Sequence, residues 1–546
     1  MGGKLLKVAT PLASCDQPAG AATCAALFKE LKNPYYIRDQ VGVSQTLGWV
    51  DAWTFEPSVY AVAARHTRDV VAAVDFAREN NLRLVVRGGG HSYLGTSSAP
   101  DSLMIWTRYM DRIDLHDDFV GEGCQDAPQP AVTVGAGAIW MQTYNAVTTR
   151  GDRYVQGGGC GTVGVAGLVQ GGGFGSYSKR YGTAAASLLE AEVVTADGEI
   201  RIANANRNAD LFWALKGGGG GTFGVVTRVT LRTHPLPNFF GRVFASIEAA
   251  SDAPFRRLIG KFVEFYAASL NNTHWGEIVK LRRRNTFEIS MSFQGLSQEQ
   301  AEGIWRPFFE WLKSSPSDYV VASEPLVIAV PARYHWDPEF LRAHFPQAIL
   351  SDDRAGASPD NIFWSGNLAE AGHVLYGFQS IWLPDALLDP ARQQSLAESL
   401  FAASRHHPLE LHFQKGLSGA SEKVIAAAAD TATNPDVLRA FVLVIVAGEG
   451  PPAYPGLPGH EPDFVSARHE AGQIDRAMET LRRLDPSAGS YVVESNFFEP
   501  HWQRAYWGPN YPRLLATKRK YDPQGLFFVR HGVGTENWSD DGFSRT

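Results

Sequence analysis

Along the first 240 residues, short apolar runs alternate with stretches whose apolar residues recur at helical spacing. Thr67 stands at the start of one such helix as its predicted cap, and Val70, Val74 and Ala77 share one face. This alternation is typical of an α/β region. The predicted elements are a helix from Thr67, strands at 84–86, 132–134 and 223–231, a strand–turn–strand at 192–200, and helices at 139–149 and 210–216.

After the proline-rich stretch 234–237 the pattern changes to long amphipathic helices and two-faced strands. Between 287 and 293 every second residue is apolar and the residues between are polar, as in an antiparallel strand with one solvated face. The change predicts a second region of α+β type, followed by a distinct tail. Its predicted helices are 253–270, 297–314, 383–404, 421–428 and 467–484, and its predicted strands are 242–248, 409–414, 440–447 and 490–496.

These changes in the pattern of apolar and polar residues divide the chain into four segments. They are an N-terminal arm (1–50), the α/β region (51–237), the α+β region (238–498) and a C-terminal segment (499–546). A chain of 546 residues is long enough for more than one domain. We therefore expect two domains and two terminal segments that pack on them.

The composition is that of a globular protein, with 44% hydrophobic and 20% charged residues. A formal net charge of −7 argues against nucleic acid or an anionic membrane as a partner. No run reaches the roughly 18 apolar residues of a membrane-spanning helix. The 54 glycines exceed the usual ~7%, and many of them lie in three loops.

The N-terminus leaves the compartment open. It has a weakly basic start and lacks the apolar core of a signal peptide. The protein is therefore either intracellular or a secreted chain without its signal peptide. In the second case Cys15 and Cys24 would form a local disulfide, and the glycosylation sequons at Asn271 and Asn537 favour secretion slightly.

Three glycine clusters, at 88–90, 157–161 and 171–173, follow or lie close to apolar runs. Residues without Cβ let backbone N–H groups approach a bulky anionic ligand. Two of these clusters carry a nucleophile, His91 or Cys160. Two spacings, at 159–164 and 219–224, match G-x-G-x-x-G. A Rossmann site is rejected, because a strand follows the second match and the first has no clear acidic partner.

Taken singly, His91 and Cys160 have plainer interpretations. The histidine would be a loop residue bonded to backbone, and the cysteine a buried small hydrophobe or half of a disulfide. No CxxC or HxxxH pattern accompanies them, so no metal site is predicted. The paired arrangement instead suggests one large ligand that is held by both loops and reacts with both.

The motifs RGGGHS (87–92) and GGGCG (157–161) resemble those of the berberine-bridge-enzyme-like FAD-linked oxidases of the vanillyl-alcohol-oxidase superfamily. Further matches at 209–227 and 506–527 extend the resemblance over nearly the whole chain. It implies an α+β, two-domain vanillyl-alcohol-oxidase-type fold. Residues 51–237 and 499–546 would form the FAD-binding domain, and residues 238–498 a substrate domain with an antiparallel sheet covered by helices.

The resemblance also implies a bicovalent FAD. His91 would bind the 8α-methyl group and Cys160 the 6-carbon of the isoalloxazine. One departure is Ala184–Ser187, where the family usually has an Asp-Asn-like pair. The further cofactor-binding residues that the resemblance implies are Arg87, Gly88, Gly89, Gly90, Ser92, Gly157, Gly159, Gly161, Gly164, Gly167, Gly172, Gly173, Val226 and Asn510.

Three positions bear on the reaction. Val163 occupies the family's oxygen gate, where a small residue goes with oxidases; plain packing is the alternative. The general base is expected on the predicted strand 490–496, where strand periodicity puts Glu494 and Tyr491 on opposite faces; Glu494 is preferred. His412, Gln414 and Lys415 resemble the substrate-facing strand, or form a polar sheet face.

The resemblance therefore predicts an FAD-dependent oxidase that takes a hydride from a C–OH group, with dioxygen as acceptor and hydrogen peroxide as product. A carbohydrate or oligosaccharide is the expected substrate. The alternatives are a tailoring oxidase of an aromatic or alkaloid-like secondary metabolite and a flavin-loaded protein without turnover. A monomer that acts extracellularly on a small alcohol or sugar is expected, with no nucleic acid or membrane partner.

Overall fold

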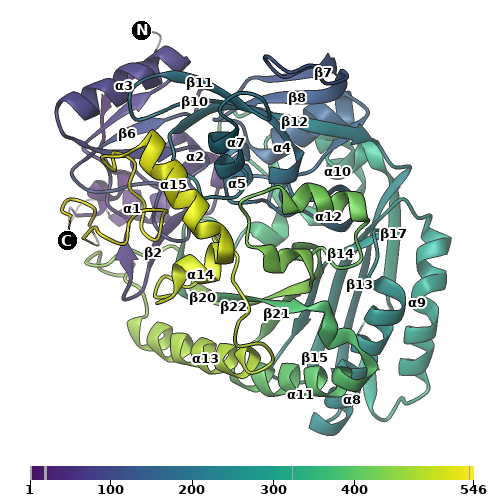
Figure 1. Cartoon of the computed structure of the whole chain (residues 1–546). Coiled ribbons are helices and arrows are strands. Elements are labelled where there is room, and N and C mark those ends of the chain that lie inside the picture. The colour runs from purple at the N-terminus through teal and green to yellow at the C-terminus, as the bar shows by residue number, and fades with distance from the viewer. Residues whose placement is uncertain (1–2, 17–20, 323, 540, 546) are drawn as a thin grey trace.

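The computed structural model of the protein describes residues 3–16, 21–322, 324–539 and 541–545. Sheets of four, six and ten strands and a two-stranded ribbon make up its β-structure (Figure 1). The four- and six-stranded sheets come from the α/β region, with one strand added from residues 4–7 of the arm. The ten-stranded sheet comes from the α+β region, with two short strands added from residues 46–54. In the described part of the chain, no helix has the length and apolar character needed to cross a bilayer.

The four-stranded sheet has the order β1-β4-β6-β5. β4, β6 and β5 are parallel, and β1 adds antiparallel to β4. Helix α3 (Thr67–Glu79) packs on this sheet and buries Val70, Val74 and Ala77, as its pattern predicts. The strands are β1 (Lys4–Lys7), β4 (Tyr60–Ala63), β5 (Arg83–Arg87) and β6 (Ser102–Trp106).

The predicted cap of α3 is wrong. Thr67 is the first helical residue, and its hydroxyl donates to Glu192 instead of to the helix start. The Asp69 carboxylate accepts the backbone N–H groups of Arg65 and His66. An acidic side chain in the first turn therefore holds the entry to this helix.

The six-stranded sheet has the order β11-β10-β12-β8-β7, with β9 paired to β12. The predicted strand–turn–strand at 192–200 is confirmed, because Val194 of β10 pairs with Ile200 of β11. The strands are β7 (Ile113–Phe119), β8 (Gln129–Gly135), β9 (Arg153–Val155), β10 (Leu188–Val194), β11 (Ile200–Asn204) and β12 (Val225–Pro235).

The ten-stranded sheet has the order β16-β13-β15-β14-β21-β22-β20-β2-β3, with β17 paired to β13. The alternation predicted at 287–293 is confirmed, since the four apolar residues of β15 are buried. Helices α8, α9, α11 and α13 enclose the core of this region (Figure 1). The strands are β2 (Thr46–Trp49), β3 (Trp53–Thr54), β13 (Phe239–Ala249), β14 (Trp275–Leu281), β15 (Thr286–Gln294), β16 (Tyr319–Val321), β17 (Leu326–Pro331), β20 (His373–Pro384), β21 (Leu409–His412) and β22 (Ala440–Gly450).

The predicted helices are found, with one shifted start, whereas α1, α2, α5, α6, α10 and α14 were not predicted. α11 begins at Pro390 rather than 383, because β20 runs to Pro384 and proline favours the first turn of a helix. The helices are α1 (Ala21–Glu30), α2 (Pro34–Asp39), α4 (Trp140–Tyr144), α5 (Val165–Gln170), α6 (Ser178–Tyr181), α7 (Ala209–Leu215), α8 (Asp252–Phe265), α9 (Gln298–Lys313), α10 (Pro338–His344), α11 (Pro390–His406), α12 (Glu422–Ala429), α13 (Phe464–Arg482), α14 (Trp502–Trp507) and α15 (Tyr511–Tyr521).

Two predicted strands of the second region differ in the structure. The 409–414 strand ends at His412, and a 3₁₀ turn takes up 413–415. Residues 490–496 form a turn, in which the Glu494 N–H donates to the Tyr491 carbonyl. The Ser380 hydroxyl donates to the Glu494 carbonyl. In a strand, that carbonyl would accept a hydrogen bond from the backbone of a neighbouring strand. The apolar, β-branched residues at 490–496 therefore predict a strand that the structure does not contain.

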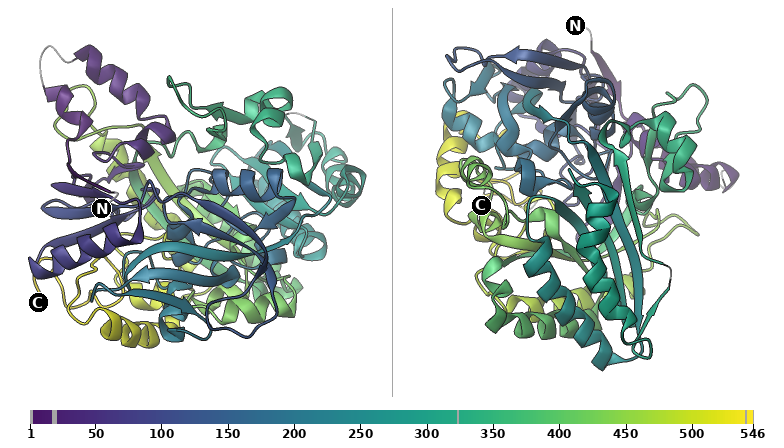
Figure 2. Two further views of the ribbon diagram at one scale, coloured as in Figure 1. Left: turned by 90° about the horizontal axis from the view of Figure 1, so that it is seen from above. Right: turned by 90° about the vertical axis from the view of Figure 1, so that its right-hand side faces the viewer.

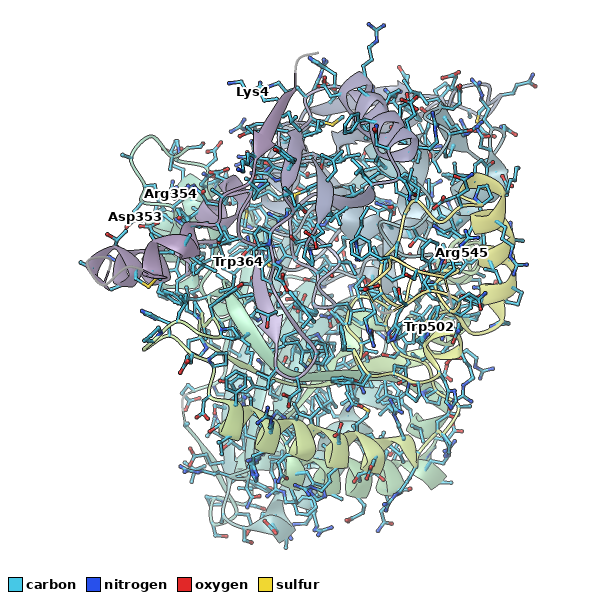
Figure 3. All side chains as sticks on the ribbon, turned by 90° about the vertical axis from the view of Figure 1, so that its left-hand side faces the viewer. Lys4, Asp353, Arg354, Trp364, Trp502 and Arg545 are labelled. Atoms are coloured by element: carbon cyan, nitrogen blue, oxygen red, sulfur yellow. A yellow bond between two sulfur atoms is a disulfide. The ribbon has the colours of Figure 1, made fainter. Side chains whose placement is uncertain are left out.

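The two terminal segments pack back onto the body. The C-terminal segment lies beside the first sheet, where Phe527 bridges to Leu84 and the Trp507 indole donates to the Gly217 carbonyl (Figure 2). The N-terminal arm carries a Cys15–Cys24 disulfide. Arg354 pairs with Asp39 of the arm at 2.9 Å (Figure 3). β3 belongs to the large sheet although it lies within 51–237, and the domain boundaries stay predictions.

Candidate active site

A cavity of about 750 Å³ lies between the glycine loops and the ten-stranded sheet. The first region contributes Gly158, Gly159, Cys160 and Val163 to its lining. The large sheet contributes Glu277 of β14, three residues at the end of β21 and, beyond it, the turn that carries Glu494. The cavity therefore brings together the two halves of the predicted site.

The two attachment loops lie against each other because they lack side chains at the contact. A Cβ on Gly89 would lie 2.6 Å from the backbone nitrogen of Gly164, and one on Gly157 would lie 2.2 Å from the Trp140 ring. Gly90 has φ +76°, in the left-handed region that favours glycine. The glycine runs thus set the close approach of the loops that carry His91 and Cys160.

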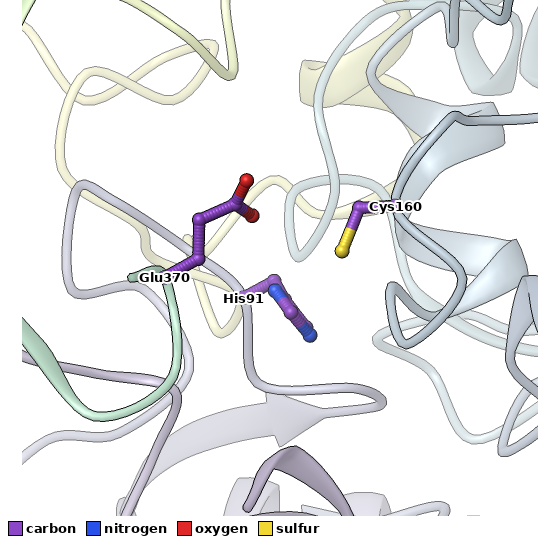
Figure 4. Close-up of side chains that lie close together, drawn as sticks. All are labelled: His91, Cys160 and Glu370. Carbon is purple, nitrogen blue, oxygen red and sulfur yellow. The ribbon is translucent and has the colours of Figure 1, made fainter. Parts of the chain in front are cut away.

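His91, Cys160 and Glu370 converge from three separate loops (Figure 4). One nitrogen, sulfur or oxygen atom of each lies within 4.8 Å of the others. Thr162 joins two of them, with its Oγ1 3.3 Å from His91 Nε2 and 3.5 Å from Cys160 Sγ. Among the described residues, the side-chain hydrogen bond of the imidazole is the one from Nε2 to Thr162. Nδ1 is therefore the ring nitrogen available for a bond to a ligand.

Burial keeps both nucleophiles uncharged. It lowers the pKa of His91 to about 3 and raises the pKa of the Cys160 thiol to about 12. A neutral imidazole and a thiol beside a large cavity fit the covalent attachment of a flavin ring. Histidine, cysteine and glutamate are also zinc ligands, so the same cluster could bind a metal ion.

The side chains of Arg87 and Ser92 are engaged within the protein. The buried Arg87 guanidinium donates to the carbonyls of Val43 at 2.7 Å and Ser97 at 3.0 Å, which ties its loop to the N-terminal arm. The Ser92 hydroxyl accepts the Thr96 N–H and hydroxyl, which closes the turn after His91. These side chains brace the loop, so its backbone and the His91 imidazole are the groups left for a cofactor.

The remaining predicted cofactor residues spread around these loops. Gly173 donates its N–H to the Tyr491 hydroxyl at 3.1 Å, and the Asn510 amide donates to the Thr433 carbonyl at 3.0 Å. Val226 is buried in β12. Gly88, Gly159, Gly161, Gly167 and Gly172 lie in or beside the loops, and Gly167 has open space where a Cβ would stand. Ala184 and Ala185, at the departure from the family pattern, donate their N–H groups to Gly173 and Gly172.

Glu494 and Tyr491 differ sharply in their surroundings. Glu494 lines the cavity and accepts a hydrogen bond from Lys415 Nζ at 2.5 Å. Tyr491 is 2% exposed, packs edge-on against Phe174 and is not among the cavity-lining residues. Burial raises the pKa of Tyr491 above its usual value of about 10. The carboxylate is therefore available to a bound molecule and the phenol is not.

The structure brings the three predicted substrate residues together. His412, Gln414 and Lys415 all line the cavity, because the 3₁₀ turn after β21 replaces strand alternation. The Gln414 amide donates to Glu277 at 3.2 Å. Val163 is half-buried and lines the same cavity, as an oxygen gate requires.

Sequence patterns missed several cavity residues. Glu277 has φ +69° in the middle of β14, a strained conformation for a residue with a side chain. Ser176 and Gln414 donate to its carboxylate. Glu370 lies in a turn without a recognisable motif, and only the fold places it beside Cys160. Tyr93 directly follows the RGGGHS motif, yet carried no signal of its own.

Another part of the cavity lining is apolar and aromatic. It includes side chains from β13, β17, helix α10 and the 364–369 loop. These residues are Phe240, Phe244, Ile328, Val330, Phe340, Phe345 and Trp364.

Two family descriptions match the sequence. An FAD binding domain matches residues 58–204, and the family described as berberine and berberine like matches residues 490–534. The FAD-linked oxidoreductase easE of Arthroderma benhamiae is 33% identical over 494 residues, which cover 88% of this chain and 90% of that protein. The FAD-linked oxidoreductase malF of Malbranchea aurantiaca is 32% identical over 490 residues, which cover 89% of this chain and 77% of that protein.

Solved structures of flavoproteins share the fold. The vanillyl-alcohol-oxidase-type flavoprotein MtVAO615 from Myceliophthora thermophila C1 superposes with a TM-score of 0.78 at 23% identity, covering 99% of this chain and 95% of that one. Glucooligosaccharide oxidase from Acremonium strictum superposes with a TM-score of 0.65 at 19% identity, covering 87% of this chain and 91% of that one. It is described as carrying a 6-S-cysteinyl, 8α-N1-histidyl FAD. The predicted two-domain α+β fold is confirmed.

Proposed function

Because the chain belongs to the berberine-bridge-enzyme-like FAD-linked oxidoreductases of the vanillyl-alcohol-oxidase superfamily, we propose that it oxidises a C–OH group of a small molecule. FAD bound to His91 and Cys160 would supply the hydride acceptor, and dioxygen would take the electrons to give hydrogen peroxide. One observation carries the proposal. Cys160 and the Lys415–Glu494 pair line the same 750 Å³ cavity, and the His91 imidazole lies within 4.8 Å of the Cys160 sulfur.

The chain's own residues have distinct tasks in this reaction. Glu494 accepts the hydroxyl proton of the substrate, since a carboxylate at the cavity wall is within reach of a bound molecule. Lys415 holds that carboxylate in place through its 2.5 Å contact. His412 and Gln414 orient the hydroxyl, and Val163 leaves room for dioxygen. Tyr491 supports the Gly173 loop rather than the reaction.

The apolar wall favours an aromatic or other ring-bearing metabolite as substrate. Aromatic side chains provide a large contact area for such rings. An oligosaccharide is the second candidate, because His412, Gln414, Glu277 and Lys280 line the same cavity and their polar groups suit hydroxyls. Glucooligosaccharide oxidase shares the fold of this chain, but a shared fold does not establish a shared substrate. The oligosaccharide candidate therefore has only an analogy of fold in its favour.

A substrate screen tests the proposal. The purified holoprotein is mixed without oxygen with aromatic alcohols, alkaloid-like alcohols, oligosaccharides and amines that lack a hydroxyl group, and the flavin absorbance is followed. Oxygen is then admitted and peroxide is measured. We expect loss of flavin absorbance with the ring-bearing alcohols and one peroxide for each substrate oxidised. If no compound reduces the flavin, the protein is a flavin carrier without turnover; if only amines do, the C–OH assignment is wrong.

A further inference from the structure

Glu370 is a carboxylate beside the attachment groups that the proposed reaction does not use. It lies in the turn before β20, and its side chain meets His91 and Cys160 within 4.8 Å (Figure 4). The Asn367 amide donates to it at 2.9 Å. Among the described residues no cation pairs with it, whereas Glu410 and Glu494 of the same cavity each pair with a lysine.

Forming a thioether at Cys160 poses a proton problem that the histidyl link does not. A neutral imidazole already carries a lone pair on one nitrogen. The thiolate is the nucleophilic form of cysteine. With a pKa of about 12, about one Cys160 thiol in ten thousand is ionised at pH 8. Attack by sulfur therefore needs a base that removes the proton as the bond forms.

The other groups near the thiol are poor candidates for that base. His91, with its pKa lowered to about 3, accepts a proton weakly. The Thr162 hydroxyl is not basic at ordinary pH. Glu449 is engaged by His373, and Glu494 lies outside the group that His91, Cys160 and Glu370 form. Burial raises the pKa of Glu370, which makes its carboxylate a stronger base than an exposed one.

We propose that Glu370 is the general base that takes the Cys160 thiol proton while the thioether to flavin C6 forms. The inference rests on the proposed function, since it requires FAD at this site. One S–C bond forms, and one S–H and one C–H bond break. The two electrons and two protons released pass to dioxygen, the acceptor of the proposed reaction, as hydrogen peroxide.

Trypsin separates the two attachment sites, which makes the links individually measurable. The predicted peptides are Gly88–Arg108, with His91, and Tyr154–Lys179, with Cys160. A bicovalent FAD joins them into one cross-linked species. The wild type, Glu370→Gln, Cys160→Ala and Glu410→Gln are expressed identically, denatured, alkylated, digested and analysed by mass. Glu410→Gln is the matched control, because Glu410 lines the same cavity but pairs with Lys280 and His412.

We expect Glu370→Gln to carry FAD on the His91 peptide alone, with Cys160 alkylated, and at least a tenfold loss of the cross-linked species. Glu410→Gln should match the wild type. Retention of the histidyl link shows in the same sample that Glu370→Gln folds and binds FAD.

Full cross-linking in Glu370→Gln would overturn the inference. So would loss of both links in Glu370→Gln when Cys160→Ala keeps the histidyl link, because a base that serves only the thiol leaves that link intact. If the wild type itself lacks both links, the proposed covalent FAD fails rather than the role of Glu370.

Discussion

The two ends of the cavity are built by different means. The attachment end consists of glycine loops whose backbones touch, and each loop carries its nucleophile within a short motif. At the opposite end, Lys415 and Glu494 come from turns far apart in the sequence and meet only through the fold. A site made by local backbone geometry leaves a sequence signature, whereas a site made by tertiary side-chain contacts leaves little.

The sharpest test of this difference is between two residues three positions apart. Glu494→Gln should slow flavin reduction by ~100-fold or more, the usual scale for loss of a general base. Stopped-flow reduction without oxygen measures this rate. Tyr491→Phe should reduce its flavin within a few-fold of the wild type, because the phenol is buried away from the cavity. Slow reduction in Tyr491→Phe with a normal Glu494→Gln would reverse the assignment.

Val163 tests whether the attachment end also controls oxygen. The residue lines the cavity close to Cys160. Val163→Leu should slow reoxidation of the reduced flavin by about tenfold, a barrier increase of ~1.4 kcal/mol, because the larger side chain narrows access. The reductive half-reaction should change little, and Val163→Ala serves as the control. Equal slowing of both half-reactions would mean that Val163 only packs.

Lys415 tests whether the opposite end depends on its ion pair. Lys415→Met leaves the Glu494 carboxylate half-buried without its cation and should cost about 1–3 kcal/mol of unfolding free energy. Denaturant unfolding of both proteins gives this difference. The double variant Lys415→Met, Glu494→Gln should recover part of the loss, since it leaves no unpaired charge. If the double variant is less stable than Lys415→Met, the pair is not the source of the cost.

A further prediction concerns acid stability. Burial lowers the pKa of His335, at the cavity wall, to about 3. In the unfolded state the histidine pKa is about 6.5. Between pH 6.5 and about 3, the unfolded state therefore binds a proton at His335 that the folded state does not bind. Stability falls as pH drops through this window, by up to about 1.4 kcal/mol per pH unit for one proton. His335→Asn should flatten the pH dependence of unfolding between pH 6 and 4; an unchanged slope would contradict this.

Sequence patterns predicted most of the fold and the attachment end of the site. Alternation on β15 and helical spacing in α3 follow directly from burial of one face. The pattern failed at 490–496, because Ser380 satisfies backbone that was expected to pair in a strand. It also failed beyond His412, where a 3₁₀ turn redirects Lys415 into the cavity. Glu370 could not be found, since nothing local marks a carboxylate that reaches Cys160 only across the fold.

The central claim, that His91 and Cys160 hold one FAD between them, is tested most directly by the mass of the denatured protein. Two links each remove two hydrogens, so the wild type, once its Cys15–Cys24 disulfide is reduced, should weigh the chain plus one FAD less four hydrogens. His91→Ala and Cys160→Ala should each carry one FAD less two hydrogens, and the double variant none. A denatured wild-type chain of unmodified mass, from protein that was yellow before denaturation, would contradict the account.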